Sequence, residues 1–169
     1  MKKVLIAALM MLMGIGAQAQ DVFKEIYDSS YKTASDPKED VGVRKIASFK
    51  VDALTYINTK TLEQLVDTTR EISKEEIAHI NAQRDSLAYF MYDYVNLFVK
   101  EYQRANKKKD KEAVLKKFRD VSINYPLYND PDRSLVLAYY NREDYLTQFS
   151  LDTDWIKANA AIRKKLRGE

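Results

Sequence analysis

Residues 73–104 read SKEEIAHINAQRDSLAYFMYDYVNLFVKEYQR, and this stretch decides the fold. Ser73 followed by Glu76 is a capping box, in which each residue's side chain accepts a hydrogen bond from the other's backbone at a helix start. The stretch then repeats apolar side chains every three or four residues, the period of a helix, at Ile77, Ile80, Leu87, Met91, Tyr94, Phe98 and Tyr102. From Ala88 to Val99 only Asp93 and Asn96 are polar. We therefore predict a helix over 74–105, buried on nearly all sides at the centre of the fold.

Acidic residues, prolines and polar breaks divide the rest of the chain into further helices. An Asp side chain can accept a hydrogen bond from a free backbone N–H at a helix start, and proline fits the first helical turn. On this basis Asp36-Pro37, Asp110, Asp130-Pro131 and Asp152 are predicted to begin helices. The predicted segments are 21–34, 37–71, 74–105, 111–124, 131–141 and 153–167.

The scarcity of glycine points to the same fold class. Gly42 is the only glycine between residues 20 and 167. A β-sandwich or barrel of this length needs several tight turns, which glycine supplies most readily because it tolerates positive φ. The sequence therefore predicts an all-α bundle of five or six helices around one long central helix.

The first nineteen residues have the features of a cleaved signal peptide. Lys2-Lys3 is followed by the apolar stretch 4–15 and then by Ala17-Gln18-Ala19, a small-x-small cleavage pattern. The apolar stretch is shorter than the roughly 20 residues that span a bilayer. We expect residues 20–169 to form a single helical domain, periplasmic or secreted, with no membrane span after cleavage.

Charge and composition argue against a nucleic-acid partner. The full chain carries 28 Lys+Arg, 25 Asp+Glu and a net charge of +3. Removal of Lys2 and Lys3 lowers this charge to +1. The basic run Lys107-Lys108-Lys109-Asp110-Lys111 contains no aromatic residue on which a base could stack.

Several catalytic chemistries are excluded by residue counts. With no cysteine and one histidine, the chain cannot build a thiolate site or a multi-histidine metal site. Glu76-x-x-His79 has the spacing of a di-iron ligand pair, but such sites need the motif twice. We predict no metal and no cofactor. The pairs Asp130/Asp132 and Asp152/Asp154 keep an acid-pair hydrolase open, although helix capping also accounts for them.

Five residues are candidates for binding. Arg84 occupies an apolar position of the central stripe, where it can lie along the core and pair with an acid or hold an anionic ligand. The others are Tyr128, Tyr139, Tyr140 and Trp155, which we expect to form one aromatic cluster at an end of the bundle. Because adjacent helical residues point about 100° apart, Tyr139 and Tyr140 cannot both face the core.

The sequence resembles small exported helical proteins of unknown function from Bacteroidetes-type Gram-negative bacteria. The resemblance is carried by residues 1–20, ending Ala17-Gln18-Ala19-Gln20, and by the phrases at 49–54, FKVDAL, and 152–155, DTDW. It implies a periplasmic or secreted location and transfers no site residues.

Three functions remain open. The first is an exported non-enzymatic protein that binds a protein partner or forms a homo-oligomer. The second is a binder of a small ligand, a sugar or a peptide, in a tyrosine-lined cleft between helices. The third is the acid-pair hydrolase. A cleft that converges on Arg84 or on the tyrosines would favour the second.

The signal peptide gives a direct prediction. Peptide mapping of the protein recovered from the cell envelope or medium should find Gln20 at the N-terminus. Recovery of the exported protein with residues 1–19 still attached would contradict it.

Overall fold

The chain is all-α, as predicted. The computed structural model describes residues 21–66, 69, 71–140 and 146–169, so the predicted signal peptide lies outside it. The described part contains six helices and no strand. They are α2 (Val22–Ser35), α3 (Val41–Leu65), α4 (Lys74–Arg104), α5 (Lys108–Asn124), α6 (Arg133–Val136) and α7 (Trp155–Arg167).

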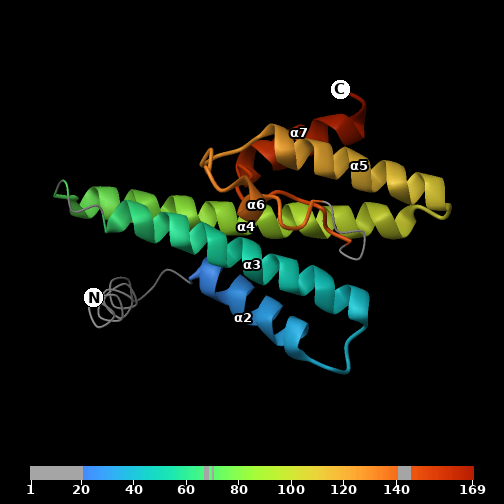
Figure 1. Ribbon diagram of the computed structural model, residues 1–169, viewed down its shortest axis with the longest axis horizontal. Coiled ribbons are helices and arrows are strands. Elements are labelled where there is room, and N and C mark those ends of the chain that lie inside the picture. The colour runs from blue at the N-terminus through green and yellow to red at the C-terminus, as the bar shows by residue number, and fades with distance from the viewer. Residues whose placement is uncertain (1–20, 67–68, 70, 141–145) are drawn as a thin grey trace.

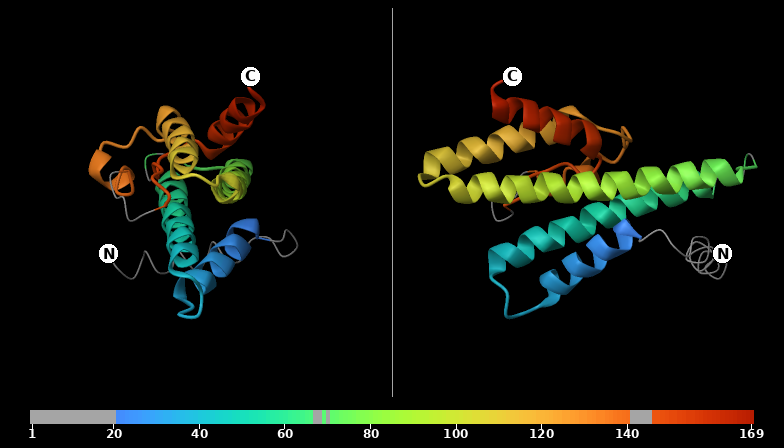
Figure 2. Two further views of the ribbon diagram at one scale, coloured as in Figure 1. Left: turned by 90° about the vertical axis from the view of Figure 1, so that its right-hand side faces the viewer. Right: turned by 180° about the vertical axis from the view of Figure 1, so that it is seen from behind.

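Helix α4 is the central element, as its apolar surface predicts, but it is not buried on nearly all sides, since Tyr89 is 53% exposed. The helix contacts α2, α3, α5 and α7. Figure 1 shows α3 and α4 crossing the middle of the molecule, with α2 on one side and α5, α6 and α7 on the other. The views in Figure 2 show the same two-sided arrangement. None of the helices in the described part is both long and apolar enough to cross a bilayer.

Six buried aromatic rings form the core on the α5 and α7 side of α4. We call them the six-ring cluster: Phe49, Tyr94, Phe98, Phe118, Phe149 and Trp155. Their neighbouring rings meet edge to face, with centroids 5.2 to 6.2 Å apart, the arrangement that aromatic pairs prefer. Because α3, α4, α5, α7 and the segment before α7 each supply a ring, the cluster joins five parts of the chain.

The Tyr94 hydroxyl fixes α5 against α4 from within this cluster. Tyr94 is fully buried, and its hydroxyl donates a hydrogen bond of 2.6 Å to the carbonyl oxygen of Phe118. A buried hydroxyl without a partner is costly, so this bond lets a tyrosine occupy the centre of the core. Desolvation raises the pKa of Tyr94 well above its ordinary value.

The helix start predicted from the capping box is confirmed. The Ser73 side chain accepts a hydrogen bond from the backbone N–H of Glu76 at 3.1 Å. The Glu76 side chain accepts one from the backbone N–H of Ser73 at 3.4 Å. Both bonds are local, so no tertiary contact is needed to position this end of α4.

The helix start predicted at Pro37 is wrong. The Asp36 side chain accepts a hydrogen bond from Lys38 and closes a turn. Helix α3 begins only after Asp40, whose carboxylate accepts from the backbone of Gly42 and Val43. A Cβ at position 42 would lie 3.0 Å from the Asp40 carboxylate, so glycine permits this cap. The helix ends at Leu65, short of the predicted 71; residues 67, 68 and 70 lie outside the described part.

Three other helices also begin at positions that differ from the predicted ones. Helix α5 begins before Asp110, because the carbonyl of Lys107 already accepts from Asp110 and Lys111. Asp110 lies in the first turn, where its charge suits the helix dipole. Asp132 caps α6 and Asp154 caps α7. Asp130 and Asp152 were the predicted caps, and each is instead buried.

The predicted helix over 131–141 is also wrong in length. Helix α6 covers only Arg133–Val136. Ala138 and Tyr140 then donate backbone hydrogen bonds to carbonyls three residues earlier, so the chain continues as tight turns. The carbonyl of Val136 accepts from the backbone of Leu151 instead of from position 140. The returning chain thereby ends the helix, and residues 141–145 lie outside the described part.

Trp155 gives a test of the six-ring cluster. Trp155→Ala should lower the free energy of unfolding by about 3–5 kcal/mol, because it removes a buried aromatic side chain and leaves a cavity. Ile156→Ala is the matched control, since Ile156 is 39% exposed on the same helical turn, and it should cost much less. Urea unfolding of both variants measures the difference; equal costs would show that the cluster does not hold the fold.

Candidate functional site

The predicted aromatic residues divide between the core and the surface. Trp155 is fully buried and Tyr139 is only 9% exposed. Both contact Phe49, at ring-centroid distances of 6.2 and 5.2 Å. Tyr140 is half-buried and its ring lies under the Arg119 guanidinium at 5.2 Å. Tyr139 thus faces the core and Tyr140 lies nearer the surface, although both lie in turns after α6 and not in the helix from which the difference was predicted.

Tyr128 is half-buried and contacts Tyr56, at 5.8 Å between ring centroids. Burial raises its pKa to about 12. The Tyr139 hydroxyl donates to the Asp52 carboxylate. Burial raises the pKa of Asp52. Trp155 and Tyr139 therefore share a contact with Phe49, whereas Tyr128 and Tyr140 contact Tyr56 and Arg119, and a single aromatic cluster stays a prediction. Their rings pack against other side chains, as expected of residues that stabilise the fold.

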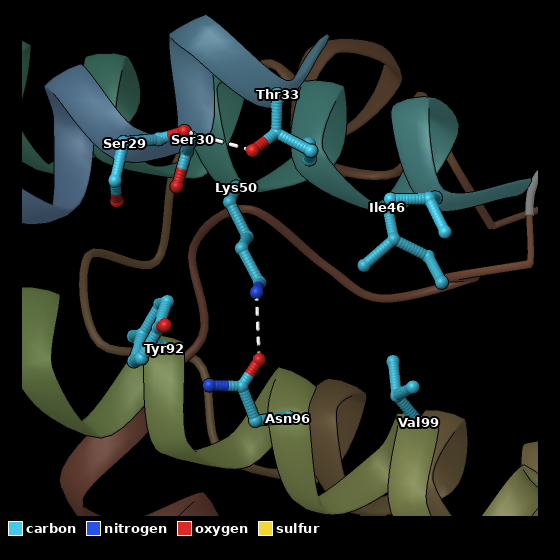
Figure 3. Close-up of a pocket in the computed structure, with 10 residues that line it drawn as sticks. Ser29, Ser30, Thr33, Ile46, Lys50, Tyr92, Asn96 and Val99 are labelled. Atoms are coloured by element: carbon cyan, nitrogen blue, oxygen red, sulfur yellow. Dashed lines mark hydrogen bonds between the residues drawn. The ribbon is translucent and has the colours of Figure 1, made fainter. Parts of the chain in front are cut away.

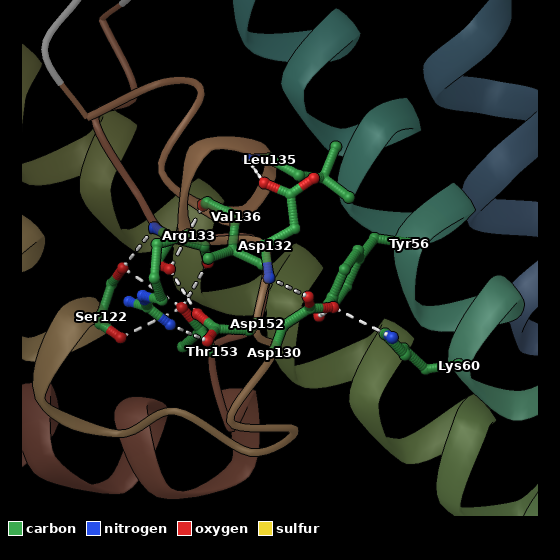
Figure 4. A network of polar contacts seen from close by, with 11 residues as sticks. Tyr56, Lys60, Ser122, Asp130, Asp132, Arg133, Leu135, Val136, Asp152 and Thr153 are labelled. Carbon is green, nitrogen blue, oxygen red and sulfur yellow. Dashed lines mark hydrogen bonds and ion pairs between the residues drawn. The ribbon is translucent and has the colours of Figure 1, made fainter.

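The acid pairs form structural contacts (Figure 4). Asp130 accepts hydrogen bonds from the Tyr56 hydroxyl at 2.8 Å and from the Asp132 backbone at 2.9 Å. Lys60 Nζ lies 2.9 Å from the same carboxylate. These contacts, led by that with Lys60, lower the pKa of Asp130 to about 2. A carboxyl that remains ionised to this pH cannot donate a proton near neutrality.

Asp152 is held in a similar way. It is fully buried, and Arg133 donates to it at 2.7 Å, as does the Ser150 hydroxyl. Its backbone carbonyl accepts from Leu127 at 2.7 Å. The other two acids, Asp132 and Asp154, cap α6 and α7, so all four carboxylates have structural partners. This arrangement does not favour the hydrolase alternative.

Arg84 closes one end of a cleft between α2, α3 and α4. Its guanidinium lies 2.8 Å from Asp85 and 3.5 Å from Asp21. It also covers the Phe23 ring at 5.0 Å. The expected acid from a neighbouring helix corresponds to Asp21, the residue that caps α2, whereas the shorter contact is with Asp85 of α4 itself.

A row of parallel aromatic rings runs along α2. Phe23 and Tyr27 have ring centroids 6.2 Å apart and planes within 15°. Tyr27 and Tyr31 are 6.3 Å apart and within 11°. Residues four apart lie on one helix face, so the three rings form a continuous surface, which we call the aromatic row. Phe23 and Tyr27 are half-buried and Tyr31 is exposed.

The aromatic row leads into a cleft of about 400 Å³, which we call the α2 cleft. Phe23 and Tyr27 line it from α2, and Leu62 and Leu65 line it from α3. The half-buried side chains of Asn58 and Asn81 also face it. Neither amide hydrogen-bonds to another side chain or backbone group of the described residues. The cleft therefore combines aromatic and aliphatic walls with two unpaired amides.

Of the residues that line this cleft, the sequence pointed to Arg84 alone. The spacing of Phe23, Tyr27 and Tyr31 was a usable signal, since aromatic residues at i, i+4 and i+8 must share a helix face. Asn58 and Asn81 gave no signal, because nothing in the sequence indicates that α3 and α4 bring them to one cleft. Among the described residues, no group of three or more His, Asp or Glu side chains could hold a metal ion.

Comparison of the chain with protein-family models, curated proteins and solved structures finds no match. The function is therefore inferred from the geometry of the site.

The depressed pKa of Asp130 predicts an acid-dependent stability. An aspartate in the unfolded chain titrates near about 3.9, and folded Asp130 titrates at about 2. The ionised form therefore stabilises the fold above about pH 4, and this contribution is lost as the pH falls toward about 2.

Asp130→Asn should lower stability near neutral pH and remove this part of the acid dependence. Urea unfolding between about pH 5 and 2 measures both effects, with the exposed Asp110→Asn as control. An unchanged acid dependence in Asp130→Asn would show that Lys60 and Tyr56 do not hold the carboxylate as described.

Proposed function

We propose that the protein is an exported, non-enzymatic carbohydrate-binding protein that holds a sugar chain along the aromatic row and in the α2 cleft. One observation carries the proposal: a row of parallel rings leads into a cleft in which two half-buried amides are unpaired. This proposal corresponds to the small-ligand alternative from the sequence. Export itself rests on the signal-peptide pattern of residues 1–19.

The aromatic row suits the flat face of a sugar ring. A pyranose presents C–H groups on its faces, and these pack against an aromatic ring as other apolar groups do. Tyrosine adds a hydroxyl that can pair with water or with the ligand at the edge of the contact. Tyr31, the exposed end of the row, is the ring that can offer this contact, because neighbouring groups pack against the rings of Phe23 and Tyr27.

The polar groups of the cleft suit sugar hydroxyls. An asparagine amide both donates and accepts hydrogen bonds, and so does a hydroxyl group. Asn58 and Asn81 can therefore bond to a sugar without giving up an existing side-chain partner.

The charges in the cleft favour a neutral ligand. Arg84 pairs with Asp85 and Asp21, and Lys24 pairs with Asp28 at 2.5 Å. No lining charge thus requires a charged ligand as a partner. A neutral oligosaccharide fits this pattern better than an acidic or basic peptide.

The alternative function is binding to a protein partner or to a second copy of the chain. The exposed large apolar side chains of the described residues are distributed over all six helices or their ends: Tyr31, Val41, Val43, Val66, Tyr89, Tyr125, Leu135 and Ile156. Binding to a protein partner therefore stays a prediction.

Titration calorimetry with cellotriose, maltotriose and triacetylchitotriose tests the proposal. At least one of these should bind saturably to the purified protein. Tyr31→Ala should weaken its binding by about threefold to tenfold, which corresponds to a lost aromatic contact of roughly 1 kcal/mol. Asn81→Ala should weaken it by a similar factor, through the lost hydrogen bonds.

Tyr89→Ala is the matched control. Tyr89 is 53% exposed on α4 and Tyr31 is 57% exposed on α2, so both substitutions should leave stability within about 0.5 kcal/mol. Only Tyr31 belongs to the aromatic row. Equal binding by Tyr31→Ala and Tyr89→Ala, or no binding of any of the three sugars, would contradict the proposal.

A further inference from the structure

A second hollow lies at the other end of the same three helices. It has a volume of about 260 Å³. The α2 cleft uses the start of α2 and the end of α3, whereas this hollow uses the end of α2, the start of α3 and the end of α4. We call it the Lys50 cavity, and Figure 3 shows it from close by.

Lys50 supplies the only charge among the residues that line this cavity. Its Nζ donates to the Asn96 side-chain oxygen at 2.7 Å and lies 4.4 Å from the centre of the Tyr92 ring. Asn96 and Tyr92 are neutral, and Lys50 has no ion pair with any described residue. Burial without a counter-charge lowers the pKa of Lys50 to about 8, because desolvation disfavours the ammonium.

Ser30 supplies a second unsatisfied group. Its residue is 4% exposed, and its hydroxyl is buried without a hydrogen-bond partner. Figure 3 shows this hydroxyl on the cavity side of α2, pointing toward α4. The neighbouring hydroxyls differ: Ser29 donates to the Ile26 carbonyl and Thr33 to the Ser29 carbonyl. A buried hydroxyl left unpaired costs free energy that a ligand would recover.

The rest of the cavity is apolar. Val43, Ile46 and Ala47 of α3 and Val99 of α4 complete its lining. A ligand that fits must therefore combine a small acceptor, placed against Lys50 and Ser30, with a short apolar body.

We infer that the Lys50 cavity binds a small aliphatic carboxylate, with its oxygens on the Lys50 ammonium and the Ser30 hydroxyl and its carbon chain on the valine and isoleucine wall. The carboxylate supplies the counter-charge that Lys50 lacks. It also accepts a hydrogen bond from the Ser30 hydroxyl, which has no other partner. This site is separate from the α2 cleft and does not depend on carbohydrate binding.

Phosphate fits the cavity less well than a carboxylate. Phosphate sites in proteins commonly use arginine, several donors or the backbone N–H groups of a helix start. The Lys50 cavity has one ammonium and one free hydroxyl, and its lining residues lie within helices. One negative charge and two oxygens match this set of donors.

Isobutyrate and isobutyramide form the test pair, because they have the same shape and differ in charge. Calorimetry on the purified protein should show saturable binding of isobutyrate and at least about tenfold weaker binding of isobutyramide. Lys50→Met keeps the aliphatic stem and should weaken isobutyrate binding at least about tenfold, through loss of a charge-assisted contact. Ser30→Ala should weaken it by about threefold or more.

Controls separate binding from folding. Lys100→Met changes an exposed lysine of α4 and should bind isobutyrate as the unsubstituted protein does. Lys50→Met should keep its helical circular dichroism, because it removes a half-buried unpaired charge. Raising the pH from about 7 to about 9 should weaken binding as the ammonium of Lys50 loses its proton; Tyr92 is the only other titratable group in the lining.

Four results would overturn the inference. They are absence of saturable isobutyrate binding, equal binding of isobutyrate and isobutyramide, unchanged isobutyrate binding by folded Lys50→Met, and tighter binding of inorganic phosphate than of isobutyrate. Loss of trisaccharide binding in the α2 cleft would leave it unaffected, so the two proposals fail separately.

Discussion

The structure depends on the burial of aromatic rings against one side of α4. Tyr94 and Phe98 of α4 contact rings from α5, from α7 and from the segment before α7. Phe49 brings α3 into the same contacts. A chain without disulfides depends on its core for stability, and these rings are among its largest fully buried side chains. The ion pairs of Asp130 and Asp152 then fix the irregular chain around α6 to this core.

The opposite side of α4 is packed less completely, and both proposed sites lie there. Of the residues in α2, only Ile26 and Ser30 are buried. The helix packs along both α3 and α4, with a hollow toward each end. The α2 cleft has paired charges and unpaired amides, whereas the Lys50 cavity has an unpaired charge. Because the polar groups of the two hollows differ, we propose a neutral ligand for the α2 cleft and an anionic ligand for the Lys50 cavity.

Capping residues and apolar stripes predicted the helices well, but tertiary contacts changed which residues begin them. The Ser73 capping box and the stripe of α4 needed no information from elsewhere in the chain, and both were confirmed. Asp130 and Asp152 were wrong as caps because Lys60, Tyr56 and Arg133 approach them from distant positions. Asp132 and Asp154, two residues later, cap instead. Arg84 was predicted within the site, but Asn58, Asn81, Ser30 and Lys50 become significant only when three helices are assembled.

The central functional claim is that ligands are recognised between α2, α3 and α4, and not at the tyrosines around α6. Backbone ¹H–¹⁵N correlation spectra, recorded while the trisaccharide that binds is added, test this most directly. The largest shift changes should cluster at residues 21–31 and near Asn58, Asn81 and Arg84. Largest changes at Tyr128, Tyr139 and Tyr140, or small changes spread over the whole chain, would contradict it.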